Sequence, residues 1–332
     1  MLPDHTFTTT VAGKTITFAS GKLAEQAGGA VTIRVGDCLL LAVATMSKNV
    51  REGLDFFPLS VDYEEKMYAA GRIPGGFYRR EGKPTTDAIL TSRLTDRPLR
   101  PLFPDGMRNE VQVIVTTLSS DSLHHMDIMS VNAASAALTI SDVPWNGPVA
   151  AVRVAYINDQ FVVNPTIPEM EASKLDLRIA GTRDAIIMVE AGADELPEHL
   201  FVEALAFGHK AMQPLIDIQE EMRAAIGKEK AEPTLASIDS DIETAVKARL
   251  GSRIKDIIAT ITDRDGRNAA MDELREEVVN SFLAEEDSPN PSVIREVIAN
   301  ELKYAVRHQI LYEGIRPDGR DYTTIRPLSS EI

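Results

Sequence analysis

Two adjacent aromatic residues and several cations share one glycine- and proline-rich stretch of the chain, residues 71–84 (GRIPGGFYRREGKP). Phe77 and Tyr78 are followed directly by Arg79 and Arg80. Aromatic rings stack on nucleic-acid bases without regard to sequence, and the planar guanidinium group pairs with phosphate through two parallel hydrogen bonds. Glycines at four positions of the stretch leave the backbone free to bend and to approach a ligand. These residue types are suited to holding a single-stranded polyanion.

The charge of the chain is unevenly distributed. The 332 residues carry a formal net charge of -15. Residues 72–100 nevertheless contain seven cations and three acids, whereas residues 217–303 contain 12 cations and 20 acids. Positive potential is therefore concentrated around the aromatic pair, where an anionic partner is favoured.

Three interpretations of Phe77 and Tyr78 remain open from the residues alone. The rings could contact single-stranded nucleic acid, because exposed aromatic area is unfavourable unless a partner covers it. They could instead contact a protein partner. Finally, they could pack beneath their own loop and have no binding role.

A second alternative concerns the arginines that follow the aromatic pair. Arg93 and Arg97 are four residues apart and share one face if the segment is helical. With Arg100 they would extend an electrostatic track for a polyanion. They could instead form ion pairs with Asp87 and Asp96 and only stabilise the helix.

Other polar groups have simpler explanations. Asp62, Glu64 and Glu65 could hold a metal ion, but a solvated acidic turn explains them as well. The adjacent His124 and His125 are expected to flank an alanine-rich helix. The chain has no G-x-S-x-G and no H-E-x-x-H motif, and we assign no catalytic residue and no metal ligand.

The first 227 residues are expected to form an α+β domain. Alternating apolar residues and short turns predict strands in hairpin order. The strand segments are 7–18 with a break at Gly13, 31–35, 38–46, 111–115, 149–157, 161–163, 175–180 and 186–189. Helices are predicted after Thr85 or Thr86, over 125–140 and over 196–222. The first of them is expected to end near Asp96 because of Pro98.

A linker is predicted over residues 228–240, and a small helical domain over 241–312. Ser240 and Glu243 fit a capping box at the start of a helix. Apolar residues then recur at helical spacing in three segments, and Gly314 is expected to close the third helix. Residues 313–332 predict a strand that would open a further domain, and the chain stops within this segment.

Composition excludes several classes of protein. The amino-terminal residues have no apolar segment typical of a secretory signal, and the longest apolar run, Cys38–Ala44, is too short to span a bilayer. We therefore expect a cytoplasmic protein without a membrane partner. The single cysteine excludes an intrachain disulfide, and we interpret Cys38 as a small buried hydrophobe.

Three segments of the sequence resemble a known family. They are FFPLSVDYEEKMYAAGRIPGGFYRREGKPTTDAILTSRLTDRPLRPLFP, NEVQVIVT and ASAALTISDVPWNGPVAAVRVAYINDQFVVNPT, and they are similar to the amino-terminal part of bacterial polynucleotide phosphorylases. The similarity runs through the whole chain. It implies a ribonuclease-PH-like domain over 1–227, a helical domain, and the opening of a second ribonuclease-PH-like domain at 313–332.

The resemblance implies an activity and an assembly. Members of the family form ring-shaped homotrimers that degrade RNA from its 3′ end with inorganic phosphate, release nucleoside diphosphates, and run in reverse as polymerases. It also implies magnesium in the intact enzyme, a role in mRNA degradation, and contacts with other components of the RNA-degradation machinery.

The resemblance further implies that the aromatic loop lines the entrance of a central channel. Tyr78 stands where a second phenylalanine is common, which keeps the ring face, and Lys83 stands where arginine is frequent, which keeps the charge. The RNA-binding residues carried over in this way are Phe77, Tyr78, Arg79, Arg80, Lys83, Arg93, Arg97 and Arg100.

Catalytic residues are not among those carried over. In the family, the phosphate-binding serines and the catalytic aspartates and lysine belong to the second ribonuclease-PH-like domain. We therefore expect these 332 residues alone to guide RNA without cleaving it. Two rival functions remain: an enzyme domain that binds a small anion or nucleotide, and a purely structural assembly module.

Overall fold

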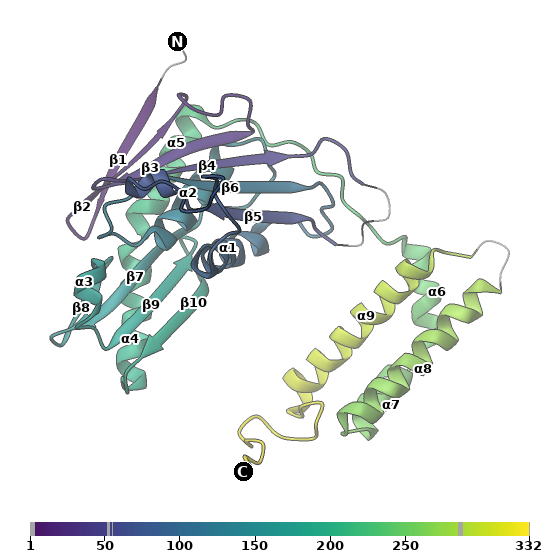
Figure 1. Cartoon of the computed structure of the whole chain (residues 1–332). Helices are drawn as coiled ribbons and strands as arrows, with labels where there is room; N and C mark the ends of the chain where they lie inside the picture. Colours follow the sequence, from purple (N-terminus) through teal and green to yellow (C-terminus); the bar gives the residue numbers. More distant parts are fainter. Residues whose placement is uncertain (1–3, 52–53, 55, 285–287, 332) are drawn as a thin grey trace. The chain divides into compact units, whose positions relative to one another are not determined.

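The computed structural model describes residues 4–51, 54, 56–284 and 288–331, which belong to two compact units, Met1–Leu235 and Ala236–Ile332 (Figure 1). The first unit contains two β-sheets and several helices, and the second is built from helices. The predicted α+β class followed by a helical region is thus confirmed. None of the described helices is long and apolar enough to cross a membrane.

The larger sheet of the first unit has six strands in the order β1-β2-β3-β4-β6-β5. Strands β1 to β4 pair antiparallel as predicted, and both residues of the β1–β2 turn, Ala12 and Gly13, have positive φ. This turn geometry matches the twist of a two-stranded hairpin. The strands are His5–Val11 (β1), Lys14–Ser20 (β2), Gly29–Val35 (β3), Cys38–Met46 (β4), Leu59–Glu64 (β5) and Val111–Ser119 (β6).

Strand β5 corrects the expectation of an acidic turn. Asp62 and Glu64 occupy exposed positions of a strand that pairs in parallel with β6, while Tyr63 between them is buried. The signal in the sequence is the alternation of apolar and polar residues that begins at Leu59. A parallel pair needs a long crossover connection, and the loop of residues 71–84 belongs to this crossover.

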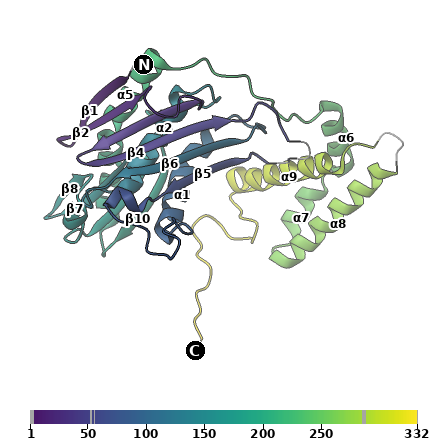
Figure 2. The same cartoon turned by 45° about the horizontal axis from the view of Figure 1, so that its top comes forward.

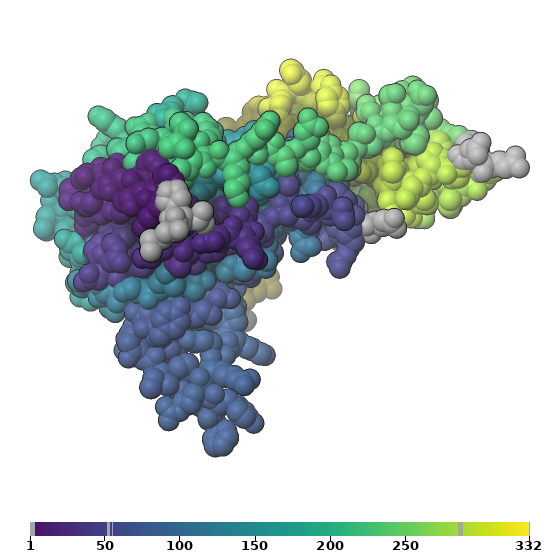
Figure 3. Space-filling view, turned by 90° about the horizontal axis from the view of Figure 1, so that it is seen from above, coloured from purple at the N-terminus to yellow at the C-terminus, as the bar shows by residue number. Residues whose placement is uncertain are grey.

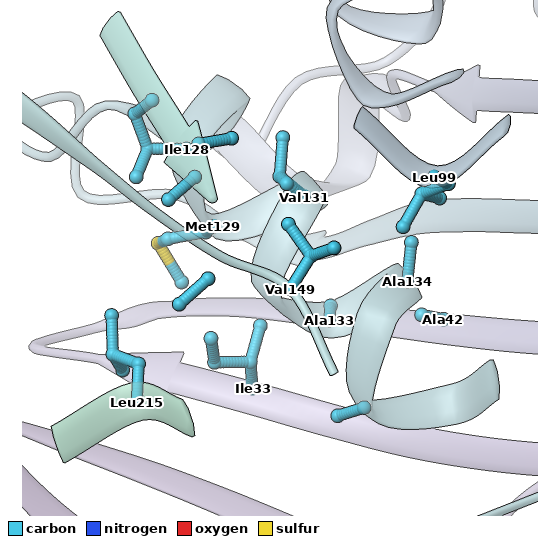
Figure 4. Packing of buried hydrophobic residues seen from close by; sticks show 14 of the residues in the cluster. Ile33, Ala42, Leu99, Ile128, Met129, Val131, Ala133, Ala134, Val149 and Leu215 are labelled. Atoms are coloured by element: carbon cyan, nitrogen blue, oxygen red, sulfur yellow. The ribbon is translucent and has the colours of Figure 1, made fainter. Parts of the chain in front are cut away.

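The smaller sheet has four antiparallel strands in the order β10-β9-β7-β8. Helix α2 (Met126–Ile140) contacts strands of both sheets, and each residue from Ile128 to Ile140 is buried. Figure 4 shows α2 side chains packed among Ile33, Ala42 and Leu215. The four strands are Ala150–Ile157 (β7), Gln160–Val163 (β8), Leu175–Gly181 (β9) and Ile186–Ala193 (β10).

Helix α1 (Thr86–Leu99) begins as predicted and ends later. The Thr85 side chain accepts a hydrogen bond from the Ala88 backbone N–H, which caps the first turn. Pro98 lies inside the helix rather than beyond its end, and a 3₁₀ turn, η2 (Arg100–Leu102), follows. The expected end near Asp96 is wrong because a proline in the last turn removes only one hydrogen bond.

The helix predicted over 196–222 is two helices. They are α4 (Glu198–Ala211) and α5 (Gln213–Ile226), which meet at Met212. Pro214 lies in the first turn of α5. It has no backbone N–H, so it cannot donate the hydrogen bond that would continue α4 into α5. One short helix that was not predicted, α3 (Ile167–Met170), follows β8.

The second unit contains four α-helices within its described residues, where three were predicted (Figure 2). The first predicted helix breaks at Gly251, whose φ is +54°. Asp239 rather than Ser240 is the N-cap, since its side chain accepts from Asp241 and Ile242. The helices are α6 (Ser240–Leu250), α7 (Arg253–Thr260), α8 (Arg264–Leu283) and α9 (Pro291–His308).

The end of α9 agrees with the prediction, and the segment after it does not. A π-helical turn, η3 (Gln309–Glu313), follows α9 and is closed by Gly314 with φ +71°. The described residues 314–331 form turns and no strand. The Arg316 N–H donates to the Arg320 carbonyl, and Asp321 accepts from two backbone N–H groups. These local hydrogen bonds replace those that a strand would make.

Candidate nucleic-acid interface

The rings of Phe77 and Tyr78 lie on the surface. Phe77 is 95% exposed and Tyr78 80%, and the two rings meet edge to face with centroids 5.4 Å apart. Figure 3 shows the blue segment that contains this loop projecting from the body of the first unit. The interpretation in which the rings pack beneath their own loop is therefore wrong, and a large exposed aromatic pair indicates a partner.

The backbone at the tip of the loop turns sharply. The Arg79 N–H donates to the Gly76 carbonyl at 3.0 Å, and Arg79 has φ +51°, a left-handed conformation that is uncommon outside glycine. Gly75 and Gly76 have open space around their α-carbons. The turn therefore brings two rings and two guanidinium groups together at one exposed tip.

Hydrogen bonds tie the two ends of the loop together. The Glu81 carboxylate accepts from the Met67 backbone N–H at 2.9 Å, at the start of the 3₁₀ turn η1 (Met67–Ala70). The Thr85 hydroxyl donates to Glu65 at 2.7 Å. A hollow of about 500 Å³ lies behind these contacts and is lined in part by Lys83. The base of the loop is thus held while its tip stays free.

Three predicted site residues, spaced by four and three, are exposed along helix α1 and the turn that follows it: Arg93 and Arg97 in α1, and Arg100 at the start of η2. Arg93 has no ion-pair partner among the described residues. Arg97 lies 3.0 Å from Glu190 of β10, and Arg100 lies 2.6 Å from Asp96 and also donates to the Leu59 carbonyl. The ion-pair alternative therefore holds for Arg100, and for Arg97 with a partner that the sequence did not suggest.

A half-buried network of charges lies next to α1, and the sequence interpretation missed it. Arg153 of β7 is 6% exposed and donates to both carboxylate oxygens of Asp176 at 2.7 Å. Arg178 contacts Asp176, Asp127 and Glu190. The sequence does contain a signal for this network, which is the arginine inside the apolar segment AAVRVAYI. A charged side chain within a buried strand is expected to have a partner of opposite charge.

The two histidines flank α2, as predicted. His125 is the residue before the helix, although its side chain makes no capping hydrogen bond. Burial and the neighbouring Arg153 lower the pKa of His125 to about 4, and its Nδ1 lies 2.7 Å from the Arg153 guanidinium. The ring is therefore neutral at pH 7 and accepts from that arginine. His124 lies in a separate contact with Asp121.

Comparison with known proteins identifies the class to which this fold belongs. Residues 12–144 match the 3′ exoribonuclease family, domain 1, and residues 147–211 match the 3′ exoribonuclease family, domain 2. The first unit thus has the two-part organisation of 3′ exoribonucleases. A solved structure described as the Archaeoglobus fulgidus exosome with RNA bound to the active site is 19% identical, covers 65% of this chain and 88% of its own, and has a TM-score of 0.49.

The particular family follows from the second unit and from the curated relatives. Residues 241–321 match the polyribonucleotide nucleotidyltransferase RNA-binding domain. The polyribonucleotide nucleotidyltransferase of Roseiflexus sp. (strain RS-1) is 48% identical over 99% of this chain and 44% of its own length, and that of Bacillus subtilis (strain 168) is 47% identical over 99% and 46%. The chain is thus similar to polyribonucleotide nucleotidyltransferases over nearly all of its own length, which confirms the predicted resemblance to polynucleotide phosphorylases. It spans less than half the length of these relatives.

Proposed function

We propose that these residues are the RNA-guiding part of a phosphate-dependent 3′-to-5′ exoribonuclease that acts in mRNA degradation. The whole enzyme would transfer the 3′ nucleotide of RNA to inorganic phosphate, release nucleoside diphosphates and work reversibly. The observation that carries the proposal is the exposure of Phe77 and Tyr78 beside two arginines at the tip of a projecting loop. The similarity to these relatives and the match to an RNA-binding domain support it.

The loop would hold RNA through features that every nucleotide has. A base stacks on an aromatic ring for roughly 1–3 kcal/mol, whichever base it is. Arg79 and Arg80 would bind phosphates on either side of a stacked base, and Lys83 would add charge near the loop base. Arg93 and Arg97 of α1 and Arg100 of η2 would continue the contact beyond the loop. Such contacts let a strand slide, as a processive enzyme requires.

The assembly and the co-substrate are also part of the proposal. Three chains around one axis would bring three such loops together as a ring, through which RNA is threaded toward the phosphorolytic site. By resemblance that site lies outside these residues, so we expect no phosphorolysis from this chain alone. The protein would act in the cytoplasm, with other components of the RNA-degradation machinery as partners.

Magnesium is implied by the family, and the acidic residues near the loop do not fit a site for it. Glu64 is paired with Lys66, Glu65 accepts from Thr85, and Asp62 accepts from neighbouring polar side chains. These carboxylates do not converge on one point. We therefore derive no step through the metal.

Fluorescence anisotropy with a labelled oligoadenylate, at fixed salt, tests the proposal. The double variant Phe77→Ala/Tyr78→Ala loses two stacking faces, and at a minimum of about 1 kcal/mol each the affinity falls by about 30-fold or more. The matched control Phe77→Tyr/Tyr78→Phe keeps both rings and is expected to bind like the native chain. Equal affinity for the native and alanine variants would overturn the proposal.

The labelled oligoadenylate and the alanine double variant also separate the two rival functions. A small-anion site would bind a mononucleotide as tightly as the oligonucleotide, whereas a strand-binding loop favours the longer ligand. An assembly module would change its mass in solution in the alanine variant and keep its RNA affinity. Light scattering with and without oligoadenylate gives that mass and tests the homotrimer directly.

A further inference from the structure

Three metal-ligating side chains meet in the first unit, apart from the loop. They are Cys38, the first residue of β4, and Asp121 and His124, both in the connection between β6 and α2. Among the residues that the structure describes, this is the one group of three whose ligand atoms all lie within 4.8 Å of one another. Cys38 Sγ is 3.1 Å from Asp121 Oδ1, and His124 Nδ1 is 2.6 Å from Asp121 Oδ2.

The connection fixes Asp121 and His124 relative to each other. Asp121 Oδ1 accepts from the backbone N–H groups of Leu123 at 2.8 Å and His124 at 3.1 Å. Cys38 is held independently by the ladder of β4, where it pairs with Val35. The group therefore joins two rigid segments, and little conformational freedom is lost when its side chains act together.

Gly36, in the turn between β3 and β4, lies close against the group. A Cβ at this position would lie 3.1 Å from Asp121 Oδ2 and 3.4 Å from His124 Nδ1, and its nearest neighbours are these two side chains. The glycine also has φ +56°, which strains any other residue. The absence of a side chain at position 36 therefore avoids crowding Asp121 and His124.

We propose that Cys38, Asp121 and His124 bind a divalent transition metal of the zinc type, with water completing a tetrahedron. Thiolate, imidazole and carboxylate together form a typical ligand set for zinc, and a thiolate selects against magnesium and calcium. Metal–ligand bonds of about 2.0–2.3 Å place tetrahedral ligands roughly 3.3–3.8 Å apart. The separations of Cys38 and of His124 from Asp121 are shorter because protons join these groups, so the metal must spread each of the two pairs by less than about 1 Å.

Binding exchanges protons for the metal, and no electrons are transferred. The Cys38 S–H bond breaks, its proton leaves to solvent, and the sulfur lone pair forms the bond to the metal. In the neutral ring, the Nδ1 proton of His124 passes to solvent and Nε2 takes one up, so that the Nδ1 lone pair is free to bind the metal. The metal would then join the start of β4 to the segment that leads into α2.

Cobalt(II) is the probe, because a tetrahedral thiolate complex of this ion has a sulfur-to-cobalt charge-transfer band in the near ultraviolet and strong visible d–d bands. Titration of the metal-free chain should give both bands at one cobalt per chain, and added zinc should remove them. Cys38→Ser should abolish the charge-transfer band, and His124→Ala should lower the affinity at least about tenfold. His199→Ala, on the exposed start of α4, is the matched control and should change nothing.

Near-ultraviolet circular dichroism of each variant, recorded without metal, shows whether it folds. If Cys38→Ser is unfolded, Asp121→Asn replaces it and should weaken cobalt binding at least about tenfold while the sulfur band is kept. A native chain that binds cobalt without a charge-transfer band, or a folded Cys38→Ser variant with the native band and affinity, would overturn the proposal. So would a native chain that binds no cobalt.

Discussion

Glu190 competes with RNA for Arg97 if α1 contacts the strand as we propose, and its removal measures that competition. Glu190 lies 3.0 Å from Arg97 and 2.9 Å from Arg178. The side chains of Arg97 and Glu190 are 47% and 41% exposed, and such a surface ion pair contributes about 0–1 kcal/mol. Glu190→Gln should therefore tighten RNA binding by up to about fivefold. Arg178 keeps Asp176 and Asp127 as partners, so its network should persist.

The salt dependence of oligoadenylate binding makes this test specific. One additional phosphate contact to a single strand makes the slope of log affinity against log salt steeper by about 0.7. Glu203→Gln removes the same charge from an exposed position on α4 and controls for the change in net charge. The difference between the two variants is the measurement. If Glu190→Gln and Glu203→Gln agree in affinity and slope, Arg97 does not lie on the RNA path.

Two further predictions concern stability, measured by urea unfolding. Lys230→Met should lower the free energy of unfolding by about 2–3 kcal/mol, because the Lys230 ammonium group donates to three carbonyls at the end of α2, those of Leu138, Thr139 and Ser141. Lys228→Met loses one exposed hydrogen bond and should cost less, and equal losses would contradict the prediction. The lowered pKa of His125, about 4, means that the unfolded chain binds a proton between pH 6.5 and 4 that the folded chain does not, so stability should fall as pH drops through this range. His125→Gln should flatten the dependence of stability on pH, and an unchanged dependence would show that His125 is not its cause.

Strands were the elements best predicted from the sequence, and breaks in helices the worst. The hairpin of β1 and β2 has a residue alternation and a turn glycine at Gly13, so two independent signals agree. Helical periodicity continues across a break, as at Met212 and Gly251, because the apolar residues on both sides still face one core. Pro214 and Gly251 were the only local signals, and each also occurs within helices or at their ends.

The candidate site was predictable in its residue types and not in its pairings. Phe77 and Tyr78 were recognisable as candidates because they stand together among glycines and arginines, but it is their exposure in the structure that excludes packing beneath their own loop. Arg97 and Glu190 lie far apart in the sequence, so no spacing rule connects them. The same holds for Cys38 and Asp121, which the pairing of β4 with β6 brings together. Contacts of this kind depend on sheet order, which one sequence does not specify.

The distribution of ion pairs explains how an acidic protein can attract a polyanion. The buried Arg153 and the half-buried Arg178 lie against carboxylates, so their fields are cancelled locally. The loop cations and Arg93 are different, since no carboxylate of the described residues lies within ion-pair distance of them. Although the chain has 50 acids and 35 basic residues, the projecting loop holds its own cations away from carboxylates. Its positive field is therefore directed toward whatever approaches its aromatic tip.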